Sequence, residues 1–241
     1  MKIKIVDTEG EDTLNAIAKA DKFNYWMYSK MIPNLNGKIL EIGSGIGNIS
    51  QYLIKDHPTA ELSDVRNQYT EKLKNKFPLQ EVHTIDLVNI DFDNDYQNLI
   101  GKFDFVFALN VIEHIEDHKT ALINMSKLIK HGGNIFVLVP AYQWLYNSFD
   151  ISLEHFRRYN IKSINELCPN DCHVKNSFYF NTFGIVGWFL VGSVLKKKII
   201  PEGNMKVYNL ITPIVKIIDF LVFKRIGLSV VSIFQKKEFI D

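Results

Sequence analysis

The sequence predicts one α/β domain with a mainly parallel sheet that is covered by helices on both faces. Short apolar segments alternate along the chain with stretches of helical periodicity, which is the pattern of βαβ units. These apolar segments are bounded by polar or turn residues, as buried strands usually are. The 241 residues are 46% hydrophobic, which is enough to bury one sizeable core.

The N-terminal segment, residues 1–33, is expected to form a helical cap. Between residues 12 and 32 apolar side chains recur at roughly helical spacing, and Pro33 ends the pattern. We therefore predict one helix over this stretch.

The rest of the chain is expected to hold seven strands. They are residues 38–42, 60–65, 81–85, 103–109, 134–139, 173–180 and 228–234. Between them, helices are expected near 49–54, 68–77, 118–129 and 161–167. Gly132 and Gly133 follow the third of these helices, and glycine just past the last turn is a common helix stop.

A segment before the last strand, residues 181–226, is expected to be a helical insert or lid. It contains thirteen apolar or small residues at 183–195, then lysines at 196–198, then a second apolar helix at 207–223. Thirteen residues are too few to cross a bilayer, which needs about 20. Three readings remain open for the insert: contact with a membrane surface through 183–198, a lid over an apolar acceptor, or extra core.

Charge and cysteine content narrow the function classes. The net charge of +1 gives no large positive field, so we expect no nucleic-acid partner. Cys168, Cys172 and His173 do not supply four ligands, so no metal site is predicted. No basic and then apolar signal segment opens the chain, and we expect a cytoplasmic protein, or one at the inner face of the membrane.

The loop after the first strand points to a nucleotide-sized ligand. Glycines at 43, 45 and 47 allow a sharp turn and a close approach of the backbone to a ligand. The dinucleotide fingerprint has its third glycine where this chain has Asn48, so the spacing favours a different adenosine cofactor. Asp64 and Asp86 stand near the ends of the next two strands, where they can bind ribose hydroxyls and the adenine amino group.

The motifs at these strand ends resemble those of class I methyltransferases, which use S-adenosylmethionine. The resemblance covers at least residues 38–140 and rests on 38–47, 63–65, 85–87 and 103–115. It implies a Rossmann-like, doubly wound, mainly parallel seven-stranded sheet with an antiparallel last strand. It implies that Glu41 and residues 43–47 hold the methionine part of the cofactor, Asp64 the ribose, Asp86 and Leu87 the adenine, and that Asn110 lies beside the sulfonium. The full set of implied cofactor residues is Glu41, Gly43, Ser44, Gly45, Gly47, Asp64, Val65, Asp86, Leu87, Asn110 and Val111.

The acceptor is expected to lie against the segment after the fifth strand. Residues 142–159 are rich in aromatic and charged side chains, and this part of the chain contains Pro140-Ala141, Leu145-Tyr146, Asp150 and His155-x-Arg157-Arg158-Tyr159. With this pattern it resembles a bacterial methyltransferase subgroup that is associated with cell-surface polysaccharides and lipid-linked sugars. His155 is our candidate general base, with Asp150 orienting it or serving instead. The candidate acceptor-binding residues are Tyr142, Trp144, Tyr146, Arg158 and Tyr159. The alternative is that His155 and Arg158 only stabilise the loop through salt bridges. For His114, a structural role is at least as plausible as a catalytic one.

The sequence therefore predicts methyl transfer from S-adenosylmethionine to a small-molecule or lipid-linked saccharide acceptor, on oxygen rather than nitrogen or carbon. Two alternatives remain at this point. One is an NAD(P)-dependent oxidoreductase, which Asn48 disfavours. The other is a binding protein that holds S-adenosylmethionine without turnover. The acceptor's identity and the oligomeric state stay open.

Overall fold

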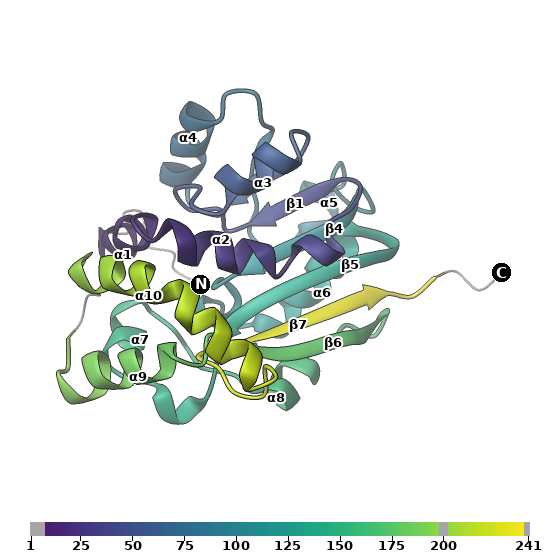
Figure 1. Ribbon diagram of the computed structural model, residues 1–241. Coiled ribbons are helices and arrows are strands. Elements are labelled where there is room, and N and C mark those ends of the chain that lie inside the picture. Colours follow the sequence, from purple (N-terminus) through teal and green to yellow (C-terminus); the bar gives the residue numbers. More distant parts are fainter. Residues whose placement is uncertain (1–7, 198–201, 239–241) are drawn as a thin grey trace.

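A computed structural model describes residues 8–197 and 202–238, which form a seven-stranded sheet between two layers of helices (Figure 1). The strand order is β3-β2-β1-β4-β5-β7-β6. The strands are β1 Ile39–Ile42, β2 Glu61–Asp64, β3 Val82–Thr84, β4 Phe103–Leu109, β5 Ile129–Pro140, β6 Cys172–Phe180 and β7 Ser229–Lys236. The first five pair in parallel, and β7 runs antiparallel between β5 and β6. The predicted fold class is confirmed.

The helices are assigned to the two faces by the alternation of apolar side chains along the central strands. Ile39, Phe105 and Phe107 face one core with α2, α3 and α10, whereas Leu40, Ile42, Val106 and Ala108 face the other core with α6. Phe103 also faces the α6 core, because the register of β4 shifts after it. The longer helices are α1 Thr8–Ala18, α2 Asp21–Ser29, α3 Ser50–Asp56, α4 Asn67–Lys76, α6 His118–Leu128 and α10 Glu202–Leu221. The short ones are α5 Phe92–Asp95, α7 Ser148–Ser152, α8 Ile161–Asn165 and α9 Gly184–Trp188, and 3-10 turns cover Ile32–Asn34, Ile112–His114 and Gln143–Leu145.

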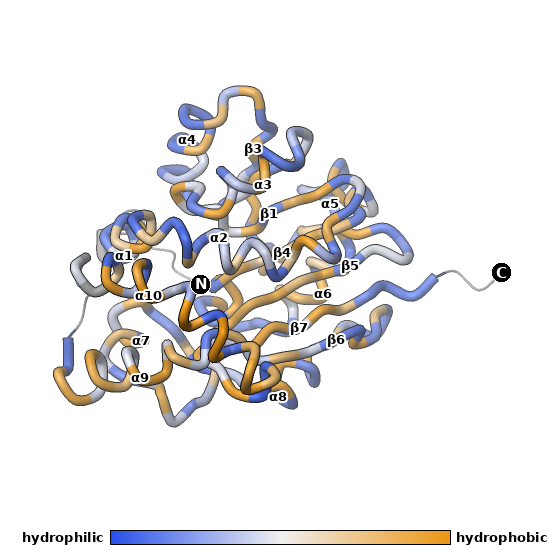
Figure 2. Tube along the Cα trace, in the orientation of Figure 1, coloured by the Kyte–Doolittle hydropathy of each residue, from blue (hydrophilic) through white to orange (hydrophobic). Residues whose placement is uncertain are grey.

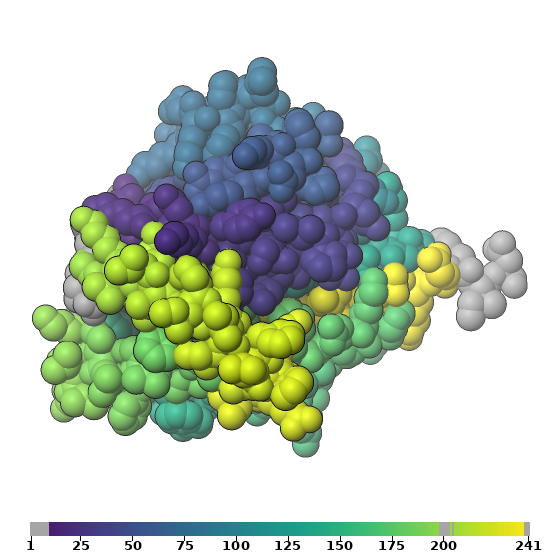
Figure 3. All heavy atoms as spheres, in the orientation of Figure 1, coloured from purple at the N-terminus to yellow at the C-terminus, as the bar shows by residue number. Residues whose placement is uncertain are grey.

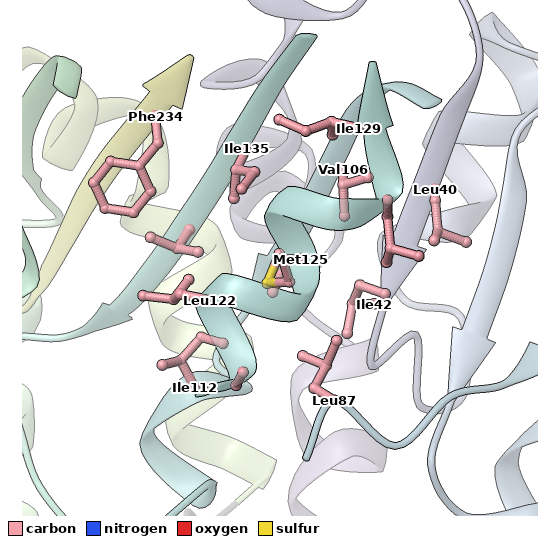
Figure 4. Close-up of a cluster of buried hydrophobic side chains, with 14 of the residues drawn as sticks. Leu40, Ile42, Leu87, Val106, Ile112, Leu122, Met125, Ile129, Ile135 and Phe234 are labelled. Carbon is pink, nitrogen blue, oxygen red and sulfur yellow. The ribbon is translucent and has the colours of Figure 1, made fainter. Parts of the chain in front are cut away.

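The core beneath α6 is close-packed and apolar. Met125 and Leu122 on the helix and Val106 and Ile135 on the sheet are fully buried there (Figure 4). The hydropathy of the chain follows the same layers, because apolar residues concentrate along the inner strands (Figure 2). This core fixes the positions of the carboxyl ends of β1 and β4. These two neighbouring strands flank the topological switch point, where the strand order of the sheet reverses. Ligands of open parallel sheets bind at that point.

The N-terminal helix prediction was wrong in one respect. Two helices, α1 and α2, replace the single one, and they part at Lys19 and Ala20. The Asn24 side chain donates a hydrogen bond to the carbonyl of Ile17 (2.9 Å) and so satisfies the open end of α1. Residues 1–7 of the expected cap lie outside the described residues.

The predicted glycine stop after α6 was also wrong. The helix ends at Leu128, and Ile129 is already extended and pairs with Phe103. Gly132 and Gly133 lie instead inside β5, where the register with β4 shifts. Glycine there accommodates a bulge, which sequence cannot distinguish from a helix terminus.

Candidate active site

The glycine loop after β1 brings backbone to the edge of a cavity. Gly43 and Gly45 have φ of 69° and 54°, values that favour glycine. A Cβ on Gly43 would lie 2.4 Å from Cγ2 of Val111, so only glycine fits. Gly47 has another role, because a Cβ there would lie 2.6 Å from Cε2 of Phe77. Gly47 thus allows close packing against the end of α4 and is the one predicted cofactor residue that does not line the cavity.

Asp64, the last residue of β2, is fixed by two backbone donors. Its Oδ2 accepts a hydrogen bond from the Gly45 N–H (3.0 Å), and its Oδ1 accepts one from the Arg66 N–H (2.9 Å). Burial raises the pKa of this carboxyl, and the two N–H groups oppose that rise. The carboxylate therefore holds the glycine loop in place and keeps free lone pairs toward the cavity.

Glu41, in the middle of β1, is a buried carboxylate beneath the same loop. The Ser50 hydroxyl donates a hydrogen bond to its Oε2 (2.6 Å). Burial raises the pKa of Glu41 to about 7, against the effect of this hydrogen bond. Near neutral pH the group therefore stands between its two protonation states, and a nearby cation would ionise it.

One cavity of about 780 Å³ gathers the remaining predicted cofactor residues. They are Glu41, Gly43, Ser44, Gly45, Asp64, Val65, Asp86, Leu87, Asn110 and Val111. Asp86 is oriented by the Val88 N–H, which donates to its Oδ1 (3.0 Å). Asn110 has a positive φ of 54°, so its backbone turns away from β4 at the cavity's edge. The pocket also takes in side chains of α1, α2, α9 and α10, such as Leu14, Phe23, Trp188 and Tyr208.

The predicted catalytic pair lies at the far side of this cavity. Nδ1 of His155 is 2.8 Å from Oδ1 of Asp150, and Arg158 donates from Nε to the same oxygen (2.8 Å). Burial alone would raise the pKa of Asp150, but the hydrogen bond to His155 and the charge of Arg158 outweigh burial and lower the pKa below its usual value. The carboxylate is therefore ionised at neutral pH. His155 and Arg158 line the cavity, whereas Asp150 stands behind them. Nε2 of His155 is therefore the free nitrogen of the ring.

Two further residues, Glu113 and His114, lie next to His155, and neither was predicted to be catalytic. Glu113 and His114 belong to the turn after β4, and both line the cavity. Glu113 is fully buried, and burial raises its pKa to about 8. Burial lowers the pKa of His114 to about 3, so this ring is neutral. Sequence placed His114 between two roles, and only the fold brings the pair to His155, forty residues further along the chain.

Four of the predicted acceptor-binding residues lie outside the cavity. Tyr142 stacks on Tyr179 with ring centres 5.0 Å apart, and Trp144 is 65% exposed. Tyr146 donates its hydroxyl to the carbonyl of His155 (2.7 Å). Tyr159 is buried, with its hydroxyl 2.8 Å from Nδ1 of His118. These aromatic side chains support the loop that carries His155, and of the five predicted residues only Arg158 faces the cavity.

Comparison with known proteins gives a domain match over less than half of the chain. Residues 40–135 match the family model of a methyltransferase domain. The chain is 25% identical over 118 residues to a highly reducing polyketide synthase of Aspergillus carbonarius and 28% identical over 113 residues to the compactin diketide synthase of Penicillium citrinum. These matches cover 42% and 44% of this chain, and only 5% and 4% of those much longer proteins.

Solved structures share the fold over most of the chain. A S-adenosylmethionine-dependent methyltransferase of Archaeoglobus fulgidus has a TM-score of 0.54 at 17% identity, covering 88% of this chain and 94% of that one. The phosphoethanolamine N-methyltransferase 2 of Haemonchus contortus, solved in complex with S-adenosylmethionine, has a TM-score of 0.54 at 17% identity, covering 90% and 52%. Residues 40–135 therefore match a methyltransferase domain, and the chain shares the fold of S-adenosylmethionine-dependent methyltransferases over most of its length.

Proposed function

We propose that this chain transfers a methyl group from S-adenosylmethionine to a hydroxyl of a small-molecule or lipid-linked saccharide acceptor. The observation that carries the proposal is that one and the same cavity joins the glycine loop and Asp64 at one end to His155 at the other. We propose further that residues 1–241 act as one domain, with 1–33 as its cap and 181–226 as its lid.

The residues at the first end of the cavity fit the cofactor. S-adenosylmethionine, when bound, supplies a methyl group on a sulfonium sulfur. An acceptor oxygen attacks the methyl carbon in line and displaces the sulfur. Asp64 has lone pairs for the ribose hydroxyls, and Asp86 has one carboxylate oxygen free for the adenine amino group. Glu41 supplies the negative charge that a buried ammonium group needs. Gly43 and Val111 leave no room for a side chain between them, which keeps the loop close to the ligand.

At the other end, His155 is the proposed general base and Asp150 its positioning residue. Because the Asp150 carboxylate takes the Nδ1 side, the ring presents the Nε2 lone pair to the cavity. An acceptor hydroxyl beside Nε2 would lose its proton to this atom as its oxygen forms the new bond to carbon. A positioned base of this kind typically contributes 10²–10⁴-fold to a rate.

The outer wall of the cavity supports an acceptor of lipid character. Helix α10 is apolar on both sides. Its inner side buries Val215 in the core together with the polar residues Thr212 and Asp219, and Asp219 accepts hydrogen bonds from the N–H groups of Asn181 and Thr182. Its outward face carries apolar side chains at helical spacing, each at least 60% exposed: Val207, Leu210, Ile214, Ile217 and Leu221. Figure 3 shows α10 at the surface beside the N-terminal helices. An apolar face of this size, when left exposed, indicates a partner.

The neighbouring segment 183–195 extends this apolar face, and positive charge borders it. Val186, Leu190 and Leu195 are exposed on this segment, and Lys196, Lys197, Lys224 and Arg225 are exposed nearby in the sequence. No helix among the described residues is long and apolar enough to span a bilayer. We propose that α9 and α10 lie on the cytoplasmic surface of an anionic membrane. Lys198, the end of the predicted contact segment, lies outside the described residues.

The route from such a surface into the cavity is short. Trp188 and Val191 of this segment, and Val207 and Ile211 of α10, also line the cavity. A lipid-linked acceptor can therefore keep its lipid in the membrane while its saccharide approaches His155. The NAD(P)-dependent alternative is not favoured, because Asn48 is engaged in a hydrogen bond from its Nδ2 to the carbonyl of Leu14 (2.9 Å) at the place where that motif has glycine.

Two measurements test the proposal. Calorimetry should detect binding of S-adenosylhomocysteine, and lipid-linked saccharides from a bacterial extract should take up labelled methyl groups from S-adenosylmethionine. For the membrane contact, the double substitution Leu210→Lys and Ile217→Lys should abolish flotation with phosphatidylglycerol vesicles and leave S-adenosylhomocysteine binding intact. Leu79→Lys is the matched control, since Leu79 is equally apolar and 93% exposed on another part of the surface. Cofactor binding without methyl transfer to any acceptor would favour a non-catalytic binding protein.

A further inference from the structure

Three side chains with metal-binding atoms meet at the acceptor end of the cavity. Glu113, His114 and His155 each place one such atom within 4.8 Å of the other two. Nε2 of His155 is 4.0 Å from Oε1 of Glu113. The rings of His114 and His155 lie 4.6 Å apart at 82° to each other, so they do not stack.

The Glu113 carboxylate is buried without a hydrogen-bond partner among the described residues. The charge of Arg158 opposes the rise in the pKa of Glu113, but its hydrogen bonds go to other groups, through Nε to Asp150 and through Nη1 to the carbonyl of Ala141. Its Nη2 is buried without a hydrogen-bond partner in the described part of the chain. Buried carboxylates are ordinarily paired with a charge or bound to a metal, and this one faces the cavity beside two imidazoles.

The orientation of His155 matches that of a metal ligand. Histidines that bind metals usually give their other ring nitrogen to a carboxylate, which fixes the ring. Here Asp150 occupies Nδ1 at 2.8 Å and leaves Nε2 toward Glu113. Asp150 is thus placed as the outer partner of a histidine ligand.

We propose that Glu113, His114 and His155 bind a divalent transition-metal ion, of the class of Zn²⁺ or Co²⁺, in the acceptor end of the cavity. Two imidazoles and one carboxylate suit such ions better than Mg²⁺ or Ca²⁺, which prefer oxygen ligands throughout. Ligand atoms about 2.1 Å from an ion lie roughly 3 to 3.5 Å from one another, so the three side chains need to close by roughly 1 Å. Three protein ligands leave a coordination position open to the cavity, as catalytic sites do.

The ion would change how the acceptor is activated, and this part rests on the proposed function. An acceptor hydroxyl at the open position has a lowered pKa, so its proton passes to bulk water. The oxygen then forms the bond to the methyl carbon, the carbon–sulfur bond breaks, and its electron pair stays on sulfur. In the loaded protein His155 is a ligand of the ion, and the general-base role described above belongs to the ion-free protein.

Metal binding is tested on the full chain after treatment with a chelator. Titration with Co²⁺, followed by visible absorption and calorimetry, should show one tight site per chain. Glu113→Gln should weaken binding by more than about 100-fold, since even outer partners of metal ligands are worth 10–100-fold. S-adenosylhomocysteine binding by the same variant shows that the cavity is still folded.

A matched control comes from a second cluster of possible ligands. Glu61, Glu81 and His83 also come within 4.8 Å of one another, away from the cavity. His83→Ala should leave Co²⁺ binding unchanged. Absence of tight Co²⁺ binding, or its loss in His83→Ala rather than in Glu113→Gln, would overturn the metal site and leave the proposed function standing. Co²⁺ binding without any S-adenosylhomocysteine binding would overturn the proposed function alone.

Discussion

Replacing Glu41 by Gln should remove a pH dependence of stability that this one residue causes. Burial raises the pKa of Glu41 from 4.5 to about 7. The difference between these values, at 1.36 kcal/mol for each pKa unit, is about 3 kcal/mol. The proton is held more tightly in the folded protein than in the unfolded one. The stabilisation is therefore fully present below pH 4.5, declines as the pH rises, and is lost above pH 7.

The assay is urea unfolding at pH 5 and pH 8. The wild-type free energy of unfolding should fall between these values, and the fall should be smaller by about 2.5 kcal/mol in Glu41→Gln, which keeps an acceptor for the Ser50 hydroxyl. Glu81→Gln is the control, because the Glu81 side chain is 74% exposed. Equal falls in wild type and Glu41→Gln would refute the reasoning.

A ligand-binding measurement on the same two proteins tests the proposed role of Glu41. An ammonium group nearby favours the carboxylate, so binding of S-adenosylhomocysteine at pH 6 should release a proton from the wild type. Calorimetry in two buffers of different ionisation enthalpy measures that proton. Its release should be absent in Glu41→Gln, and equal release by both proteins would contradict the assignment.

Four further predictions concern single side chains. Asp64→Ala should weaken S-adenosylhomocysteine binding at least tenfold by calorimetry, because a hydrogen bond to a charged group is worth about 1.5–3 kcal/mol; unchanged affinity would remove the ribose assignment. His155→Ala should slow methyl transfer by about 10²–10⁴-fold with cofactor affinity intact, and an undiminished rate would make the residue structural. Gly43→Ala should lower both the melting temperature and cofactor affinity, since the new Cβ would meet Val111 at 2.4 Å. Met125→Ala should cost about 2–5 kcal/mol in urea unfolding, and a smaller loss would mean that the core under α6 can collapse.

Most of the strands could be predicted because local sequence determines them, whereas the doubly wound arrangement of the sheet was predicted from the family resemblance. The apolar run that ends at Ile42 is closed by a glycine, and the run of β4 is long and uninterrupted. The residues of the proposed cofactor end could be predicted in the same way, because Asp64 ends one strand, Asp86 closely follows the next, and parallel strands end at one edge of the sheet. Backbone geometry then brings these side chains to one cavity without help from distant contacts.

The acceptor end depends on contacts that no local pattern records. The backbone N–H of Phe156 donates to the carbonyl of Glu113 (2.9 Å), and this bond joins two loops of different strands. It brings His155 to Glu113, whereas the aromatic residues Tyr142 and Tyr159 turn toward the supporting side of the loop. The sequence shows that polar and aromatic residues are concentrated here, but their directions are set by tertiary structure.

The exposed apolar face of helix α10 has a consequence for how this protein can vary. The helix is anchored on its inner side by Asp219, which accepts hydrogen bonds from Asn181 and Thr182, and by buried Val215, so the folded state gains little from Leu210 or Ile217 on the outer side. Replacements on that outer side should change what the protein associates with while leaving its folding almost untouched. The choice of partner surface is thus separable from the stability of the domain, and a more water-soluble form for crystallisation should be obtainable by polar substitutions on this one helix face.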